Sequence, residues 1–511
     1  MTLQRLITMV ICVGMLITGA VCGAEPRESR TWTSADGRFS VQATMVGHED
    51  KHVTLRRDDD GREIRVPLSV LGHRERQYVA RWIRQNQAAA DPSDPGANSK
   101  DSTSLPAGEF DWPRWRGVSL DGRSTELGLL ASWPDQGPPL VWQVDGLGTG
   151  FASVSVANGR IYTMGRLNGI EHLMALDEAT GAKLWSTPIG PGGTERGSNG
   201  TPTVDGQFVY AISIEGDLLC VRAEDGQPVW SKNFARDFGG RMMSQWGFSE
   251  SPLVDGPLLI CTPGGPQAVM AALDKRTGKT VWTTAMPFGG SHGQDGAGYS
   301  SIVISHAGGV KQYVQLVGRG LIGVQASNGQ LLWRYDRIAN GTANIPTPIV
   351  FDDYVFTSTG YGTGAALLRI VRGGRQLQVQ EQYFLPSDQL QNHHGGMILV
   401  DGYLYCGHGH NNGFPVCIDI RSGKQVWGDQ RGPGSNSAAV AYADGQLYFR
   451  YENGVMALIQ ATPQGYQLNG SFRLPSVRAQ SWPQPVIANG RLYLRDQEVL
   501  MCYDVRNEGG S

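Results

Sequence analysis

Closely spaced histidines are the clearest candidates for chemistry in this sequence. His393 and His394 are adjacent, and His408, His410 and Asn411 follow a short distance along the chain. Imidazole nitrogens bind transition metals, and histidine also transfers protons near neutral pH. The four histidines therefore form a candidate metal site. In a second interpretation they hydrogen-bond to loop backbones and to each other, since no cysteine pair or run of acidic ligands accompanies them.

A second group of polar residues lies in long irregular stretches earlier in the chain. Arg241 and Trp246 belong to one such stretch, and His292 and Asp295 belong to the next. Loops held on a rigid scaffold are where binding and catalytic residues usually lie. No serine or cysteine nucleophile motif is recognisable, so no catalytic residue is assigned.

An internal repeat must position these residues. Each unit, roughly 45 to 50 residues long, reads as strand, Asn-Gly or Asp-Gly turn, strand, loop, strand, Thr-Gly-type turn and a strand ending in tryptophan. Asp205-Gly206 is one of the first turns, and Thr180-Gly181, followed by Trp185, is one of the second turns. Counting the first turns gives eight units.

The two ends of the repeat array complement each other. The last unit ends near Val505 without a fourth strand, and residues 139–143 match the missing strand. Pairing these two segments would close the array into a ring without open sheet edges at its ends. The predicted fold is therefore all-β: an eight-bladed β-propeller over residues 110–505, followed by a tail over residues 506–511.

The predicted meander places its tight turns and its longer loops on opposite rims of the ring. Its Asp-Gly and Thr-Gly turns lie on one rim, which we call the turn rim. The loops between second and third strands, and those between blades, lie on the opposite rim, which we call the long-loop rim. The candidate ligand-binding residues all fall on the long-loop rim: Arg241, Trp246, His292, Asp295, His393, His394, His408, His410 and Asn411.

The repeats give the tryptophans and most cysteines a structural interpretation. The tryptophan that ends each unit is expected to pack between blades. Cys220, Cys417 and Cys502 share a column in which other units carry alanine or glycine, so the column requires a small apolar residue. We expect these cysteines to be buried free thiols; a Cys406–Cys417 disulfide is the alternative.

The repeat resembles the PQQ-like β-propeller family over about residues 110–505. Its signature, residues 175–185, reads Ala-Leu-Asp followed by Thr-Gly-Ala-Lys-Leu-Trp, with copies at residues 272–282 and 417–427. The opening Trp-Pro-Arg-Trp-Arg-Gly of residues 112–117 is also similar to the start of this class in exported bacterial proteins. The family includes quinoprotein dehydrogenases and the scaffold subunit of the outer-membrane assembly machine. The resemblance implies the propeller fold. It does not decide whether a quinone is bound, since many members of the superfamily bind none; PQQ with calcium stays open.

Residues 25–86 form a separate small module. Residues 39–45 and 52–56 alternate in polarity as half-buried strands do, and residues 74–86 have one apolar helical face. Together with Trp32 and residues 64–71, this order of motifs resembles the SLA1 homology domain 1. That family implies an SH3-like barrel with a C-terminal helix here, binding short peptides as an adaptor. A polar linker, residues 87–109, follows.

Residues 1–24 have the features of a signal peptide. Arg5 precedes the apolar residues 6–21, and Cys22-Gly23-Ala24 offers small residues for cleavage before Glu25. An uncleaved membrane anchor and lipid attachment at Cys22 are the alternatives. We expect a periplasmic or secreted protein with no transmembrane segment after cleavage. With 44 Lys and Arg against 47 Asp and Glu, no field of one sign favours nucleic acid as a partner.

These patterns suggest three functions. The favoured one is a non-catalytic binding or scaffold protein, in which the long-loop rim binds a protein or a glycan and the small module adds a tethered peptide-binding site. The second is a PQQ-dependent dehydrogenase, which requires calcium with carboxylate ligands and an aspartate that acts as the catalytic base. Asp295, Asp237 and Glu250 are the candidate carboxylates for these roles. The adjacent cysteine pair typical of quinoprotein alcohol dehydrogenases is absent. The third is a metal-dependent enzyme that uses the four histidines named above.

Overall fold

The computed structural model contains two units, each described by itself. The first unit ends at Lys100 and the second begins at Asp101. The predicted signal peptide lies outside the described residues, as do most of the linker and most of the helix predicted for the small module. Within the described part of the chain, no helix is long and apolar enough to cross a membrane. The described residues are 29–34, 40–49, 52–68, 70–71, 75, 78–79, 108, 110–191, 197–287, 289–374, 376–428 and 430–507.

The small unit contains an antiparallel four-stranded sheet. Its core is built on Trp32, which is fully buried and whose indole donates to the Ala43 carbonyl at 2.9 Å. Tyr78 lies edge-on against Trp32 and is helical, as is Val79. The strands expected from alternating polarity are confirmed. The strand order is β1 (Ser29–Thr33), β2 (Ser40–Glu49), β3 (His52–Arg57) and β4 (Glu63–Pro67).

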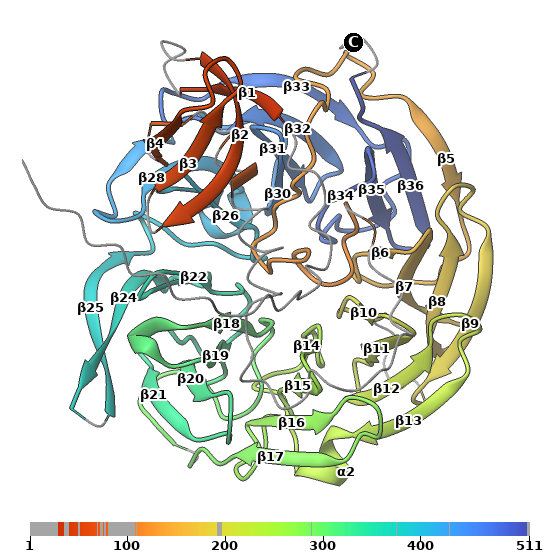
Figure 1. The fold of residues 1–511 in the computed structure, drawn as a ribbon. Helices are drawn as coiled ribbons and strands as arrows, with labels where there is room; N and C mark the ends of the chain where they lie inside the picture. Colours follow the sequence, from red (N-terminus) through yellow and green to blue (C-terminus); the bar gives the residue numbers. More distant parts are fainter. Residues whose placement is uncertain are drawn as a thin grey trace, which may run out of the picture. The chain divides into compact units, whose positions relative to one another are not determined.

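The described residues of the large unit form eight more four-stranded antiparallel sheets, which we call blades 1 to 8 in chain order. Figure 1 shows them around a common centre, with the first strand of each blade nearest to it. The all-β propeller architecture is therefore confirmed. Short connections include α2 (Phe234–Phe238) and the 3-10 turns η1 (Ala307–Gly309) and η2 (His410–Asn412).

The strands of blades 1 to 4 are β6 (Ser155–Ala157), β7 (Arg160–Leu167), β8 (Ile170–Asp177), β9 (Lys183–Ile189), β10 (Thr203–Asp205), β11 (Phe208–Ile212), β12 (Asp217–Arg222), β13 (Pro228–Asn233), β14 (Leu253–Asp255), β15 (Leu258–Cys261), β16 (Met270–Asp274), β17 (Thr280–Thr284), β18 (Val303–Ser305), β19 (Gln312–Val317), β20 (Gly320–Gln325) and β21 (Leu331–Tyr335). The strands of blades 5 to 8 are β22 (Ile349–Phe351), β23 (Tyr354–Thr359), β24 (Gly364–Gly373), β25 (Gln376–Pro386), β26 (Met397–Val400), β27 (Tyr403–His408), β28 (Phe414–Asp419), β29 (Gln425–Trp427), β30 (Ala438–Ala443), β31 (Gln446–Tyr451), β32 (Val455–Gln460), β33 (Leu468–Arg473), β34 (Val486–Ala488), β35 (Arg491–Asp496), β36 (Val499–Asp504) and β5 (Leu140–Val144).

The two ends of the propeller pair as predicted. The last strand, β36, hydrogen-bonds in antiparallel register to β5, with Cys502 opposite Trp142. Blade 8 is thus completed by a strand that precedes blade 1 in the sequence. Closing a ring in this way removes the sheet edges that an open array would leave at its two ends.

The small-residue column has a direct structural cause. In every blade the register between the third and fourth strands shifts at one position, next to the column residue. In most blades this residue lies opposite the tryptophan, as Cys220 does opposite Trp230 and Gly323 opposite Trp333. A Cβ atom at Gly323 would overlap the Trp333 ring. A large indole on one strand therefore requires a small partner on the next.

The five described cysteines are free and buried, so the prediction for the column is confirmed. The alternative Cys406–Cys417 disulfide is wrong. Cys406 pairs with Val416 on the neighbouring strand, one position away from Cys417. Successive strand residues point to opposite faces of a sheet. Accordingly Cys406 packs in a cluster with Phe356 of blade 5, whereas Cys417 packs in a cluster with Val440 of blade 7.

The column tryptophans pack between blades, as predicted. The Trp185 indole donates to the Ala223 carbonyl of the next blade at 3.1 Å, and Trp230 donates to Lys275 at 3.0 Å. Trp185 also lies against the turn of blade 2, where a Cβ atom on Gly226 would come within 2.6 Å of the ring. Glycine is therefore favoured at position 226 for two reasons. A side chain would overlap Trp185, and the backbone φ of +73° is one that glycine adopts without strain.

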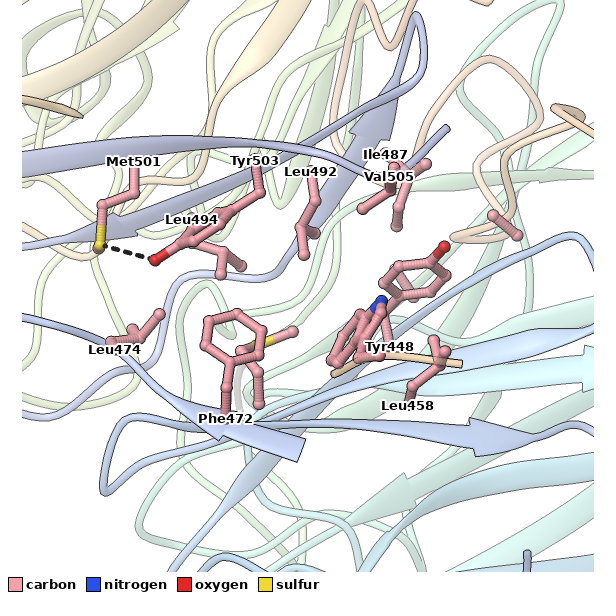
Figure 2. Packing of buried hydrophobic residues seen from close by; sticks show 14 of the residues in the cluster. Tyr448, Leu458, Phe472, Leu474, Ile487, Leu492, Leu494, Met501, Tyr503 and Val505 are labelled. Carbon is pink, nitrogen blue, oxygen red and sulfur yellow. Dashed lines mark hydrogen bonds between the residues drawn. The ribbon is translucent and has the colours of Figure 1, made fainter. Parts of the chain in front are cut away.

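Blade 7 has glycine where the other blades have tryptophan or tyrosine. Its column residue, Leu458, lies opposite Gly470. Trp133 fills the space instead, since a Cβ atom on Gly470 would meet the backbone and Cβ of Trp133 within 3 Å. The Trp133 ring lies edge-on to Tyr448 and Phe472 in the core between blades 7 and 8, part of which Figure 2 shows. An indole from outside the repeat thus replaces the missing one.

Trp133 belongs to a segment, residues 110–133, that we call the strap. Its first part binds the innermost strands of blades 1 to 3: Trp112 bridges to Val156, the Pro113 carbonyl accepts from Val204, and Arg114 donates to the Val254 carbonyl. Its later part binds blades 6 to 8 through contacts of Arg116 with Met397, Arg123 with Leu399, Ser124 with Tyr442 and Glu126 with Gly490. The strap therefore crosses the centre of the ring, where Figure 1 shows it in orange.

Candidate functional site

Six aromatic side chains form a continuous stack on the long-loop rim. In order they are Phe151, Trp482, His394, His393, His410 and Tyr361. Successive ring centroids lie 4.5, 4.5, 3.9, 4.0 and 4.5 Å apart, and the ring planes are tilted by 32° to 60°. We call this group the ring stack. Its members come from loops next to blades 1, 5, 6 and 8, so only closure of the propeller brings them together.

Hydrogen bonds hold the middle of the ring stack in place. One nitrogen of His393, Nδ1, lies 2.6 Å from the Ser437 hydroxyl, and Nε2 lies 3.0 Å from the Tyr361 hydroxyl. The Asn411 side-chain oxygen accepts from the same Ser437 hydroxyl at 3.2 Å. The buried Nδ1 of His394 has no partner among the described residues. The partners of His393 are neutral groups, and no carboxylate among the described residues hydrogen-bonds to His393.

The imidazoles of the ring stack favour the uncharged state. Burial, together with the neighbouring His410, lowers the pKa of His393 to about 3. Burial also holds the pKa of His394 well below its usual value and lowers that of His410. A desolvated imidazole loses the hydration that stabilises its charged form. At neutral pH the ring stack is therefore an uncharged aromatic surface.

The structure does not bring the four candidate histidines together in one group. His408 lies outside the ring stack, and its Nδ1 accepts from the Gln391 backbone at 3.2 Å. Stacked rings present their faces to each other, whereas a metal site needs ring nitrogens directed at one point. Among the residues that the structure describes, no three His, Cys, Asp or Glu side chains are arranged to hold a metal ion.

Trp246 lies in a second aromatic group on the same rim. Its ring is edge-on to Tyr299 at 6.0 Å, within an apolar cluster that includes Met243 and Ala343. Tyr361 packs against this cluster as well as against His393 and His410. Tyr361 therefore connects Trp246 with the ring stack, although the sequence patterns indicate only Trp246 and the histidines as candidates.

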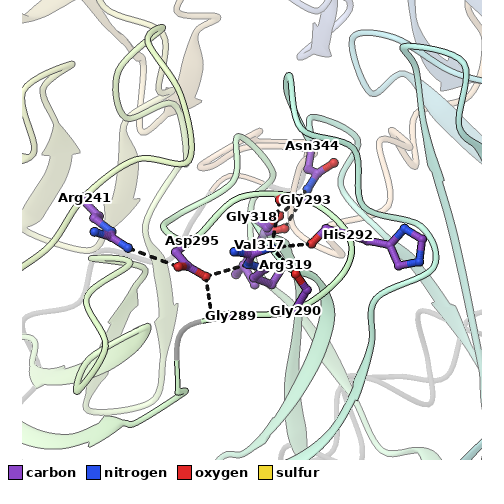
Figure 3. A network of polar contacts seen from close by, with 10 residues as sticks. All are labelled: Arg241, Gly289, Gly290, His292, Gly293, Asp295, Val317, Gly318, Arg319 and Asn344. Carbon is purple, nitrogen blue, oxygen red and sulfur yellow. Dashed lines mark hydrogen bonds and ion pairs between the residues drawn. The ribbon is translucent and has the colours of Figure 1, made fainter.

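Asp295 and Arg241 meet in a separate polar network, shown in Figure 3. Asp295 accepts from Arg319 Nε at 2.6 Å and pairs with Arg241 at 3.4 Å. The hydrogen bond from Arg319 lowers the pKa of Asp295. Arg319 also donates to three backbone carbonyls, including that of His292, whose ring points away from the network. This network anchors the loop before blade 4, and it leaves Asp295 fully ionised and doubly paired.

The three candidate carboxylates of a dehydrogenase do not share a site. Asp237 accepts from Arg236, which lowers its pKa, and from the Asn233 backbone beside α2. Glu250 is buried and accepts from the Thr262 backbone at 2.5 Å; burial raises its pKa to about 7. Each of the three carboxylates is thus engaged with different partners in a separate part of the propeller.

Two protein-family models match this chain. The model described as "Outer membrane protein assembly factor BamB" matches residues 169–429. This chain belongs to that family. A second model, SLA1 homology domain 1, matches residues 22–87, where the small module was predicted.

Curated relatives of the BamB family are similar over part of their length. The outer membrane protein assembly factor BamB of Burkholderia pseudomallei is 31% identical over 116 residues, which cover 22% of this chain and 27% of that protein. The protein of that name from Shewanella oneidensis is 24% identical over 232 residues, covering 45% of this chain and 53% of that protein. The chain thus matches about half or less of these relatives.

Solved structures share the propeller fold. A quinohemoprotein alcohol dehydrogenase from Comamonas testosteroni superposes with a TM-score of 0.53 at 13% identity, covering 78% of this chain and 81% of that one. A europium-containing methanol dehydrogenase gives 0.52 at 12% identity, covering 75% and 89%. At such identities the likeness concerns the fold alone.

The residues of this BamB-family chain do not fit a bound quinone with calcium. A quinone held over an aromatic floor requires an open ring face. The Trp482 ring is stacked against both Phe151 and His394, with ring centroids 4.5 Å away in each case. Calcium requires several converging oxygen ligands, and the three candidate carboxylates are each committed elsewhere, as described above.

The sequence patterns did not indicate Phe151, Tyr361 and Trp482 as site residues. Two signals were available. Trp482 lies outside the tryptophan column, as Trp246 does, and Tyr361 occupies the same second-to-third-strand loop in blade 5 that holds His410 in blade 6. Phe151 carries no such signal, since its loop is recognisable only once blade 8 has closed onto the chain before blade 1.

Proposed function

We propose that this chain is an exported, non-catalytic binding protein that contacts a protein partner through its long-loop rim. The observation that carries the proposal is the ring stack together with the Trp246 cluster. Five of the six stacked rings are partly exposed, the exception being His393. Aromatic residues at partly exposed, uncharged positions are typical of the central contacts of protein interfaces.

Further observations support binding over catalysis. His393, a neutral histidine, lies within the ring stack, and the rim carboxylates Asp295 and Glu250 are engaged with an arginine or with a backbone amide. A general base needs a free lone pair within reach of a substrate proton. Membership of the BamB family agrees with a scaffold role, and it suggests a partner among proteins of the cell envelope.

The small module adds a second contact. Its match to SLA1 homology domain 1 and its four-stranded sheet around Trp32 support a peptide-binding adaptor. We propose that it binds a short peptide independently of the propeller, with the linker as a tether. The signal-like residues 1–24 support a periplasmic or secreted location for both units.

Site-specific photo-crosslinking tests the proposal for the rim. A photoreactive amino acid replaces Asn411, which is exposed beside the ring stack, or Lys279, which is exposed on the turn rim. In cells that make the protein, Asn411 should give a discrete crosslinked protein adduct that Lys279 does not give. A second substitution, Trp482→Ala, should abolish the Asn411 adduct, because it removes the large indole that joins Phe151 to His394 in the stack.

Two controls make the result decisive. The substitution Val281→Ser changes an exposed apolar residue on an outer strand, Val281, and should leave the Asn411 adduct unchanged. Circular dichroism should show the same fold for each variant. The proposal is wrong if both crosslinking positions give the same adducts, if neither gives one, or if Trp482→Ala has no effect.

A further inference from the structure

A cavity of about 210 Å³ lies between the strap and the innermost strands of blades 4, 5 and 6, apart from the ring stack. Its walls are aliphatic on the blade side, with Val303, Ile349, Val350 and Leu399. Sites for drug-sized ligands enclose about 300–1,000 Å³, so a ligand of this cavity would be smaller. The cavity belongs to the propeller alone and is independent of the function proposed above.

Charged side chains of the strap line the same cavity. Arg114 donates from Nη1 to the Val254 carbonyl and from Nη2 to the Val118 carbonyl. A guanidinium has five N–H groups, so three of them have no described partner, including the buried Nε–H. No described carboxylate forms an ion pair with Arg114, and the nearby Asp255 is paired with Lys311.

Arg116 has a different role in the same cavity wall. It is 2% exposed and donates to the carbonyls of Leu120, Asp121, Gly395 and Met397, which ties the strap to blade 6. Nearly all its N–H groups are therefore used within the protein. Arg114 is the lining arginine that retains hydrogen-bonding capacity for a ligand.

Asp121 supplies the opposite charge. One oxygen of its carboxylate accepts from the Arg123 backbone at 3.1 Å, and no bond is described for the other. The loop that holds it is backbone-strained, since Arg116 and Leu120 both adopt left-handed φ values, +61° and +60°. Val118, in the same loop, is 55% exposed. Residues with strained backbone cluster at functional sites, including ligand clamps.

We propose that this cavity binds a small free aliphatic amino acid. Its carboxylate would pair with Arg114, its ammonium group with Asp121, and its side chain would contact the aliphatic wall. A ligand with only one of the two charges would leave either the Arg114 guanidinium or the Asp121 carboxylate without a hydrogen bond from the ligand, which is unfavourable. This requirement distinguishes a free amino acid from a fatty acid or a peptide terminus.

Isothermal titration of the purified exported protein tests this site. The probes are leucine, 4-methylpentanoate, which lacks the ammonium group, and 3-methylbutylamine, which lacks the carboxylate. A hydrogen bond to a charged group contributes about 1.5–3 kcal/mol, which corresponds to roughly ten-fold or more in affinity. Leucine should therefore bind with one-to-one stoichiometry and at least about ten-fold more tightly than either analogue.

Variants assign the two charges. Arg114→Gln should weaken leucine binding by about ten-fold or more, and Asp121→Asn should weaken leucine binding without changing that of 4-methylpentanoate. Arg160→Gln is the matched control, because Arg160 also donates to backbone carbonyls between blades but lies outside the cavity. The inference is overturned if leucine does not bind, if an analogue binds equally well, or if Arg114→Gln binds as the wild type does. The wild-type comparison needs no variant, so it remains decisive if a variant fails to fold.

Discussion

The column tryptophans and the ring stack are both aromatic, but they differ in what their rings pack against. Each column tryptophan, such as Trp185, faces a small residue on one strand and a turn glycine of the next blade. The ring stack instead joins loops next to four blades, and each ring mainly contacts another ring. The first arrangement recurs because every blade needs it to pack. The second occurs at one place, which is typical of a site and not of a packing rule.

The replacement of Trp133 should have the largest effect on stability. Trp133→Ala would leave a cavity between blades 7 and 8, where no column tryptophan can fill it. Removing a buried tryptophan costs about 3–5 kcal/mol. Urea denaturation should show a loss of that order. A loss below about 1 kcal/mol would mean that the strap does not contribute to the core of the closed ring.

Acidification should distinguish the ring stack from the tryptophan column. The folded-state pKa of His393 is about 3, below its value in the unfolded chain. The unfolded state therefore binds the proton first, and stability is lost as pH falls below about 6.5. From pH 7 to pH 5 the loss from this residue is about 2 kcal/mol.

His393→Asn should remove that part of the pH dependence, and His292→Asn, at an exposed loop position, should not. The measurement is the urea midpoint at each pH. Equal pH dependence of His393→Asn and the wild type would contradict the burial of a neutral imidazole in the stack.

Comparing substitutions at two turn glycines separates the effect of the contact between blades 1 and 2 from the effect of backbone strain. Gly226→Ala places a Cβ atom against Trp185, whereas Gly256→Ala meets nothing within 4 Å. Both glycines have positive φ, so both substitutions strain the backbone. The overpacked Gly226 variant should lose about 1–3 kcal/mol more than the Gly256 variant. Equal losses of stability in thermal or urea unfolding would show that the Trp185 ring moves aside without lowering the free energy of unfolding.

Replacing a column cysteine should have the smallest effect. Alanine occupies the equivalent position in blades 1 and 3, as Ala175 and Ala272, so Cys220→Ala should cost about 1 kcal/mol or less. Thiol-specific reagents should not react with the native protein at its described cysteines, which are buried. A loss above about 2 kcal/mol would show that the thiol does more than fill space.

Sequence repeats predicted the propeller because the same packing problem recurs in each unit. Turn glycines, column tryptophans and small partners are local requirements, and each leaves a mark at a fixed spacing, as at Gly226 and Trp185. Ring closure was predictable for the same reason, since β5 carries the pattern that the last unit lacks. The role of the strap was not, because Trp133 substitutes for a repeat position from far away in the sequence.

The sequence determined the fold of the large unit and the rim on which its candidate residues lie. Tertiary structure alone decided which of them meet: His393, His394 and His410 stack with Trp482, while His408 and Asp295 belong to other contacts. The reason is geometric. A repeat fixes the height of a loop on the ring, but the direction of each side chain depends on neighbours contributed by other blades and by the strap.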